Sequence, residues 1–332
     1  MKKVAFILML AIAMVAAGSN ATTVRSQTQS GGELLRLLPD GNILAVIDVQ
    51  RVTSSRLWAT LSTQPKVKSA LDKMQSDISD VGVSLSDVQT IALVFSGKGI
   101  SDPTVAVTGG FDQTEVLSRL RSNQKIKLTS ELYKNHEVYR ADSLPASAPG
   151  DAETPGAVAP ARKSNETSFY FYDSKTVVVG SAASVRASVD ARSGARASVA
   201  QNPKLTEGIV QNASAAVRFA INLTPSMTSG LPTFEIPIPD FSSVNLIFGA
   251  VDVASGVTLN ATLRNATADH ARSLADRLNG LLMAGKGLLA SSSNPKMSAL
   301  TEALKSVNIV GNDIDVTITA SLPEELFAQL FK

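Results

Sequence analysis

The sequence predicts an α+β protein built from two related modules, each an antiparallel sheet with helices on one face. Two stretches, Val257 to Leu263 and Ile314 to Ala320, place apolar residues at every second position. Such alternation is typical of strands with one packed and one wet face. The order strand, strand, strand, helix, strand, helix occurs twice along the chain, which predicts an internal duplication. Hydrophobic residues make up 44% of the 332 residues, enough for a folded core.

The N-terminus predicts export. The opening residues, Met-Lys-Lys, precede an apolar run from Val4 to Ala17, and the small residues Ser19 and Ala21 suit positions −3 and −1 of a cleavage site. The run is shorter than a helix needs to span a bilayer, so we expect a signal peptide over residues 1–21, with an uncleaved anchor as the alternative. The short basic start indicates a bacterial protein in the periplasm or secreted. No transmembrane helix is expected after signal removal.

The first module is expected over residues 34–204, after a flexible leader at 22–33. It opens with a short amphipathic helix, Glu33 to Leu38, which ends at a Pro-Asp-Gly turn. Residues 143–164 are rich in Pro, Ala, Gly and Ser and predict a surface excursion or linker. The other expected elements are strand Ile43–Val49, helices Thr53–Ser62 and Lys66–Ile78, strands Thr90–Phe95 and Thr104–Thr108, helix Asp112–Arg121, strands Lys125–Leu128 and Glu137–Tyr139, a hairpin of strands Phe169–Tyr172 and Thr176–Val179, and helix Ala182–Ala191.

The second module is expected over residues 205–332, and its elements repeat the order of the first. Each strand and helix has a counterpart in the first module at the corresponding place in the order, although identity between the halves is low. The expected elements are strands Ala215–Leu223, Val244–Val251 and Val257–Leu263, helix Thr267–Leu289, strand Ile314–Ala320 and helix Pro323–Phe331.

Composition excludes several kinds of chemistry. The chain has no Cys, which rules out disulfides, thiolate metal sites, Cys nucleophiles and a lipid-bearing Cys. Without the two lysines of the signal peptide, the basic residues equal the 29 acidic ones in number. A neutral mature chain argues against nucleic-acid binding, which requires a basic face. The two histidines, His136 and His270, have no metal-ligand spacing and are expected to be solvated.

The catalytic motifs that match by letters are expected to be accidental. Gly280, Gly285 and Lys286 fit part of a P-loop, but they lie in a predicted helix, whose backbone N–H groups cannot hold a phosphate. Ser122 and Lys125 have the spacing of a Ser-Lys nucleophile, but Ser122 lies at the end of a helix and no partner motif is present. We therefore predict no catalytic residue, no cofactor and no metal site.

The segment Leu231 to Phe241 combines three prolines with apolar residues and is expected to be extended. One interpretation is a loop tucked over the core of the protein. The other is an exposed apolar lip that contacts a partner. The candidate contact residues are Leu231, Phe234, Ile236, Ile238 and Phe241.

The start of the first module resembles a known group of proteins. Leu38-Pro39-Asp40 followed by Leu44-Ala45-Val46-Ile47-Asp48-Val49 is similar to the opening of exported bacterial proteins of unknown function. In those proteins a signal peptide precedes tandem α+β modules, and Ala220-Ile221-Asn222-Leu223 echoes the same strand here. The resemblance implies the fold and the export, and it implies no activity.

These observations predict an exported, non-catalytic binding or envelope-associated protein. The expected partner is an envelope protein, a glycan or a lipid. The alternative is a periplasmic hydrolase using carboxylate chemistry, because carboxylate pairs are brought together by the fold and have no local signature. Two converging acids, one of them buried, would favour the hydrolase, whereas a shallow polar sheet face would favour binding.

Overall fold

The computed structural model describes residues 27–79, 81–96, 102–143, 166–228, 241–290 and 295–330. The expected signal peptide and residues 231–240 lie outside these ranges, as does nearly all of the Pro-rich excursion.

The first half of the described chain contains seven strands, with helices before, between and after them. In chain order its elements are α2 (Gln27–Leu37), β1 (Ile43–Asp48), α3 (Val49–Thr53), α4 (Arg56–Leu61), α5 (Pro65–Ser79), β2 (Val88–Phe95), β3 (Pro103–Gly109), α6 (Gln113–Ser122), β4 (Ile126–Tyr133), β5 (His136–Ser143), β6 (Glu166–Asp173), β7 (Thr176–Gly180) and α7 (Ala182–Arg192).

The second half contains five strands in the described residues. Its elements are α8 (Pro203–Gln211), β8 (Val217–Asn222), α9 (Pro225–Thr228), β9 (Val244–Asp252), β10 (Val257–Asn265), α10 (Ala268–Ala290), α11 (Pro295–Lys305), β11 (Asn308–Asn312), β12 (Asp315–Leu322) and α12 (Glu324–Leu330).

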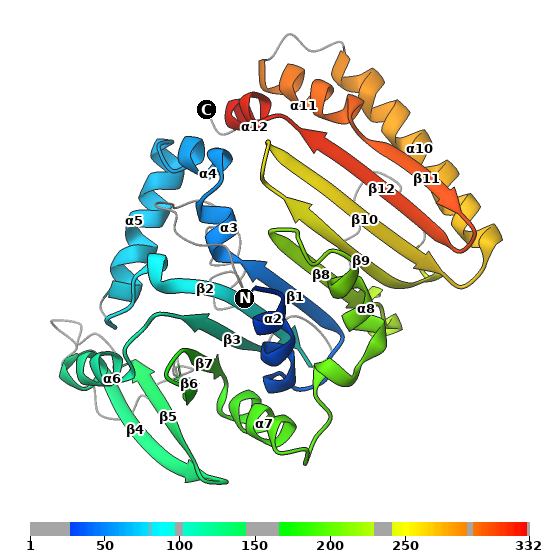
Figure 1. The fold of residues 1–332 in the computed structure, drawn as a ribbon. Coiled ribbons are helices and arrows are strands. Elements are labelled where there is room, and N and C mark those ends of the chain that lie inside the picture. The colour runs from blue at the N-terminus through cyan, green and yellow to red at the C-terminus, as the bar shows by residue number, and fades with distance from the viewer. Residues whose placement is uncertain are drawn as a thin grey trace, which may run out of the picture.

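All twelve strands form one antiparallel sheet. Their order across it is β11-β12-β10-β9-β8-β1-β2-β3-β7-β6-β5-β4. The sequence predicts a sheet in each module, but the structure joins the halves in one sheet because β1 pairs with β8, from Ile43 opposite Ile221 to Ile47 opposite Val217. The edge strands β4 and β11 lie at opposite ends of the molecule (Figure 1).

The prediction that helices cover one face of the sheet is wrong. Leu44 and Val46 of β1 pack in one buried cluster with residues of α2, α7 and α8. Ile47, the neighbour of Val46, packs on the opposite face with residues of α3, α4 and α5. The physical reason is that β1 and β2 are nearly continuous apolar runs, which is the pattern of strands buried on both faces. The alternation of apolar and polar residues in the outer strands β10 and β12 is absent from the central strands β1 and β2.

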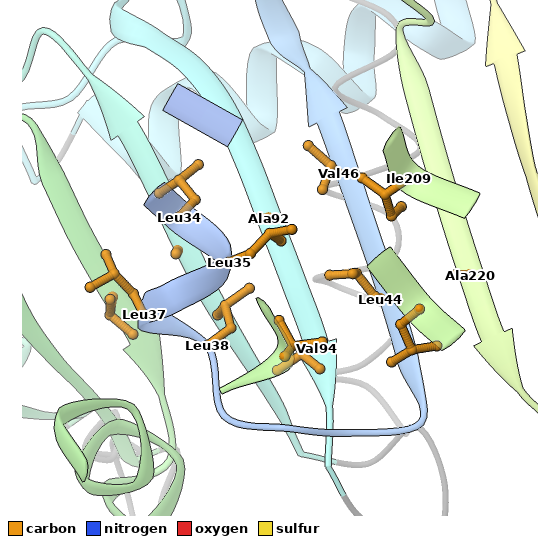
Figure 2. Close-up of a cluster of buried hydrophobic side chains, with 14 of the residues drawn as sticks. Leu34, Leu35, Leu37, Leu38, Leu44, Val46, Ala92, Val94, Ile209 and Ala220 are labelled. Carbon is orange, nitrogen blue, oxygen red and sulfur yellow. The ribbon is translucent and has the colours of Figure 1, made fainter. Parts of the chain in front are cut away.

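Helix α2 lies across the central strands, and its leucines reach the sheet. Leu34, Leu35, Leu37 and Leu38 are all buried at the end of this helix and just after it. Figure 2 shows them over β2, with Ile209 of α8 beside β1. The helix begins at Gln27, earlier than the Glu33 start that the amphipathic pattern predicts.

Several elements were not expected from the sequence. The helices α3, α8, α9 and α11 and the strand β11 have short or mixed apolar patterns. Strand β11 ends at Asn312, and the turn into β12 contains Asp313, whose φ of 51° is left-handed. Asp and Asn tolerate that conformation better than other non-glycine residues, so Asp313 suits the turn of the β11–β12 hairpin.

Candidate functional site

The strands β10, β12 and β11 present polar side chains on one face of the sheet. We call this surface the polar face. Because side chains alternate along a strand, every second residue belongs to it. Its members are all exposed or half-buried, and all but Val310 are polar: Thr258, Asn260, Thr262, Arg264, Asn308, Val310, Asn312, Asp315, Thr317, Thr319 and Ser321.

The strand register places these side chains in rows across the sheet. Thr262 of β10 lies opposite Thr317 of β12, which lies opposite Val310 of β11. In the next row Asn260 lies opposite Thr319. Directly paired residues in an antiparallel sheet share a face, so hydroxyl and amide groups recur at about the 4.8 Å spacing of neighbouring strands.

The opposite face of the same strands is packed. Leu263 and Val316 are buried against Ala271, Leu274 and Ala275 of α10. Figure 1 shows α10 behind β11 and β12, and shows no helix of the described residues in front of β10 and β12. In the first half the corresponding front face is covered by α2 and α7. In the described part of the second half, no helix therefore covers this polar sheet surface.

Helix α8 covers the sheet only as far as β9. Its Gly208 lies so close to Phe248 that a Cβ atom on the glycine would come within 2.5 Å of the Phe248 Cβ. The absence of a side chain at this helix position allows the close contact. Phe248 is buried, and it marks the boundary between the covered strands and the polar face.

Arg264 is the fixed charged group of the polar face. Its Nε donates to Asp315 Oδ1 at 3.0 Å and its Nη2 to Asp315 Oδ2 at 3.1 Å, a bidentate pair. Nη1 lies 3.9 Å from Glu207 Oε2, and the guanidinium lies 5.4 Å from the Phe248 ring. The hydrogen bonds to Asp315 raise the pKa of Arg264, against a smaller opposing effect of burial. The arginine is thus held in place and its charge is compensated.

The polar face is rich in groups that can form hydrogen bonds. Thr, Ser and Asn side chains offer both hydrogen-bond donors and acceptors without net charge. The polar face contains no histidine to activate a hydroxyl as a nucleophile, and its one aspartate is engaged by Arg264. The surface can therefore form hydrogen bonds with a polar ligand.

Among the described residues, Asp48 is the one buried carboxylate. It lies at the end of β1, where its Oδ1 accepts a hydrogen bond from the backbone N–H of Arg51 at 2.9 Å and so caps α3. Its Oδ2 lies 3.5 Å from Arg51 Nε. This is the geometry of a helix cap with an ion pair, and no second acid of the described residues is placed against it.

The motifs considered in the sequence lie apart from one another. Gly280, Gly285 and Lys286 are within α10, as expected. The Ser122 hydroxyl donates to the Arg119 carbonyl at the end of α6. His136 opens β5, with its ring 5.7 Å from that of Tyr170, and His270 is exposed near the start of α10.

Of the five candidate contact residues, four lie outside the described residues: Leu231, Phe234, Ile236 and Ile238. Phe241 is described, and it is half-buried against the cluster that β9, β10, β12 and α10 form.

The sequence contained part of the signal for the polar face. The alternation in β10 and β12 predicts a wet side with Thr258, Asn260, Thr262 and Thr317. It does not show that β11 extends this surface, although Asn308 and Asn312 share its spacing of two. Nor does it show which strands the helices leave uncovered, because that depends on contacts between residues far apart in the chain.

No helix in the described part of the chain is long and apolar enough to cross a membrane. Within the same residues, no group of three or more His, Asp or Glu side chains is arranged to hold a metal ion.

Comparison with known proteins gave structural matches alone. No family model and no curated protein matched the chain. Among solved structures, crystal form I of TP0453, a Treponema protein of unknown function, is similar with a TM-score of 0.45 and 10% identity over 90% of this chain and 95% of that one. Crystal form IV of TP0453 has a TM-score of 0.46 and 8% identity over 92% of this chain and 99% of that one. We carry no function or residue role over from either.

Proposed function

We propose that the chain is an exported, non-catalytic binding protein that contacts its ligand through the polar face. The observation that carries this proposal is an uncovered sheet surface of hydroxyl and amide side chains on β10, β12 and β11, backed by a packed core on α10. A sheet fixed from behind holds its outward side chains in a regular array, which lowers the entropy lost when a ligand binds.

The chemistry of this surface favours an uncharged glycan as the ligand. Sugars present many hydroxyl groups that both donate and accept hydrogen bonds, as Thr, Ser and Asn do. The charge of Arg264 is compensated by Asp315 and Glu207, so the surface gives no strong attraction to a polyanion. The other expected partners, an envelope protein or a lipid, would bind better to a more apolar surface.

The alternative of a carboxylate hydrolase has less support. Such an enzyme needs two acids about 5–10 Å apart across the substrate, one with a raised pKa. Asp48 is buried but is engaged by Arg51 and the α3 backbone. Asp315 is on the polar face but is held by Arg264.

The proposal is tested by glycan binding of the purified chain. We expect retention on an array of neutral oligosaccharides that includes N-acetylglucosamine and glucose oligomers. The double variant Thr262→Ala with Thr317→Ala should weaken binding about tenfold, since each lost hydrogen bond contributes roughly 0.5–1.5 kcal/mol. Thr129→Ala on the exposed strand β4 is the matched control and should bind as the parent does.

Two results would reject this function. One is equal retention of the double variant and the parent, which would place binding elsewhere on the molecule. The other is release of new reducing ends from the oligosaccharides, which would favour the hydrolase. Both threonines point away from the core, so we expect the double variant to fold, and circular dichroism checks this.

Export is part of the proposal. The charged start, the apolar run and the small residues before Thr22 support cleavage after Ala21. N-terminal sequencing of the protein recovered from a bacterial periplasm should begin at Thr22. A chain that keeps Met1 and stays in the membrane fraction would instead support the uncleaved anchor.

We also propose that the two halves arose by duplication. From the centre outward the strand order is β1-β2-β3-β7-β6 in the first half and β8-β9-β10-β12-β11 in the second. Each order consists of three successive strands followed by a hairpin whose later strand lies inside. The shared order supports the proposal, and β4 and β5 are then an addition to the first half. The backbones of these two sets of five strands should superpose in this order. If they superpose more closely when the strands of one half are matched one place along the order of the other, duplication is contradicted.

A further inference from the structure

Strand β4 is one edge of the sheet, and half of its backbone hydrogen-bonding groups face away from its neighbour β5. Tyr133 and His136 flank a two-residue turn whose residues both have positive φ, so they form a hydrogen-bonded pair. Hydrogen-bonded and non-hydrogen-bonded pairs alternate along an antiparallel ladder. The N–H and C=O groups of Leu128, Ser130 and Leu132 therefore point outward, and no strand of the described residues pairs with them.

The described structure shows none of the common protections of an edge strand on β4. Natural edges are short, interrupted by bulges or prolines, or covered by another element. Strand β4 has eight residues, contains no proline and keeps one register with β5 along its whole length. Leu132 near its end is 75% exposed. Such a strand can accept a further strand at its outer side.

The two charged side chains of β4 have opposite signs and lie on the same face of the strand. Thr129 lies midway between Lys127 and Glu131. Lys127 is exposed and forms no ion pair with another described residue. The Glu131 carboxylate is held by Arg186 of α7 at 2.6 Å, yet half of the glutamate side chain is exposed. The strand therefore carries a fixed negative charge and an unpaired positive one.

We propose that β4 pairs in antiparallel fashion with β4 of a second copy of this chain, in a two-fold symmetric dimer centred on Thr129. In this register Lys127 of each copy lies opposite Glu131 of the other. These two residues fall in non-hydrogen-bonded pairs across the interface, where facing side chains lie closest. The exposed Leu132 of each copy lies opposite Ile126 of the other. The strand is thus complementary to itself, as a two-fold interface requires.

The charges select this register among those that form the backbone hydrogen bonds. With Thr129 at the centre, Leu128 of each copy pairs with Ser130 of the other, and their outward N–H and C=O groups bond. A centre at Lys127 or Glu131 places like charges opposite each other, which is unfavourable. A centre at Leu128 or Ser130 places neither charge opposite another charge of β4. Replacing Thr129 by alanine alters neither the backbone bonds nor the charges.

The other edge of the sheet does not offer the same complementarity. Strand β11 has five residues and no charged side chain. The polar face lies on β10, β12 and β11, at the opposite end of the sheet from β4. The dimer therefore does not depend on the proposed glycan ligand, and glycan binding and dimerisation can fail independently.

Sedimentation velocity of the purified full chain tests the dimer. A contact between two single strands is small, so we expect weak association with dissociation in the micromolar range. Between about 5 and 500 µM the chain should convert from monomer to dimer, and added salt should weaken the dimer. A chain that remains monomeric over this range at low salt would overturn the proposal.

Charge reversal tests both the partner and the register. Lys127→Glu faces Glu131 of the other copy and should weaken dimerisation about tenfold or more. Glu131→Lys, combined with Arg186→Glu to keep an ion pair with α7, should be equally weak alone. A mixture of the two variants should form dimers, because each glutamate then faces a lysine. Lys204→Glu, at an exposed residue of α8, is the matched control and should dimerise as the parent does.

A proline variant tests the backbone contacts separately from the charges. Ser130→Pro removes an outward N–H and breaks no hydrogen bond to β5, so it should prevent dimerisation and leave the monomer folded. Circular dichroism and the Tm check the folding of each variant. A dimer that persists in Ser130→Pro would place the contact at another surface. A mixture of the charge variants that stays monomeric would reject the pairing of β4 with itself.

Discussion

Tyr139 of β5 shows how one buried hydroxyl ties stability to pH. The residue is 3% exposed, its ring stacks on Phe169 with centroids 5.2 Å apart, and its hydroxyl donates to Glu137 Oε2 at 2.7 Å. Burial, followed by the hydrogen bond to Glu137, raises the pKa of Tyr139 to about 12. An unfolded tyrosine ionises near pH 10, so the neutral hydroxyl is favoured by folding.

We therefore expect stability to fall as the pH rises from about 10 to about 12. A group whose pKa is raised by folding contributes fully below its unfolded pKa and loses that contribution as the pH approaches its folded pKa. For the parent chain, the free energy of unfolding in urea should decrease between about pH 9.5 and pH 11.5. In Tyr139→Phe this decrease should be smaller by about 2 kcal/mol. If the free energy of unfolding depends on pH in the same way for the parent and the variant, ionisation of Tyr139 does not cause the decrease.

Phe241 is the one described residue of the segment Leu231 to Phe241, so its packing can be tested. The ring packs against the buried cluster that contains Val244, Leu263 and Leu274. Phe241→Ser should lower the free energy of unfolding by about 2 kcal/mol, less than for a fully buried phenylalanine, because part of the ring is exposed. Phe234→Ser, at a residue expected to contact a partner, should leave the Tm unchanged. An unchanged Tm for Phe241→Ser would show that its packing contributes little to stability.

Within the helices, replacing each of two glycines by alanine should have opposite effects on stability. Gly208 of α8 faces Phe248, and an added Cβ would come within 2.5 Å of it, so Gly208→Ala should push α8 off β9 and cost about 1–3 kcal/mol. Gly280 of α10 has no neighbouring atom within 4 Å of an added Cβ, so Gly280→Ala should stabilise the helix by about 0.5–1 kcal/mol.

Urea unfolding of the two alanine variants measures both effects. Gly280→Ala serves as the control for the substitution itself, since both glycines lie within helices and receive the same methyl group. A destabilisation of similar size at both positions would mean that contact with Phe248 is not what requires glycine in α8.

Elements with a clean pattern could be predicted, and those defined by distant contacts could not. The alternation in β10 and β12 and the amphipathic start of α10 identify their type and their packed side. Helix α8 has a central glycine and a short apolar pattern, and its place over β9 depends on Phe248, far along the chain. The part of the polar face on β10 and β12 could thus be predicted from the sequence. Its limits depend on the positions of helices such as α8, which could not be predicted.

At the scale of the whole molecule, the two halves share both layers of the core. Ala220, Leu246 and Phe248 of the second half pack with Leu44 and Val46 of the first on one face. On the opposite face Ala216 and Val253 join the cluster around Trp58. The Thr60 hydroxyl also donates to Glu324, which links α4 to α12. Separating the halves at residue 205 would expose the β1 and β8 edges and cut both clusters.

The chain should therefore unfold in a single cooperative transition. Trp58 is the one tryptophan and is buried in the first half, so its fluorescence reports on that half, while far-UV circular dichroism reports on the whole chain. Val316→Ala, in the cluster under α10, and Val178→Ala, under α7, each remove a fully buried side chain and should cost about 2 kcal/mol. If the two halves unfold together, each variant should lower the transition temperature of both signals, Trp58 fluorescence and circular dichroism, by the same amount. The reason is that neither half is then stable without the other. A Trp58 transition that stays at the parental temperature in Val316→Ala, while the circular dichroism becomes biphasic, would instead identify two independently folding modules that merely pair their central strands.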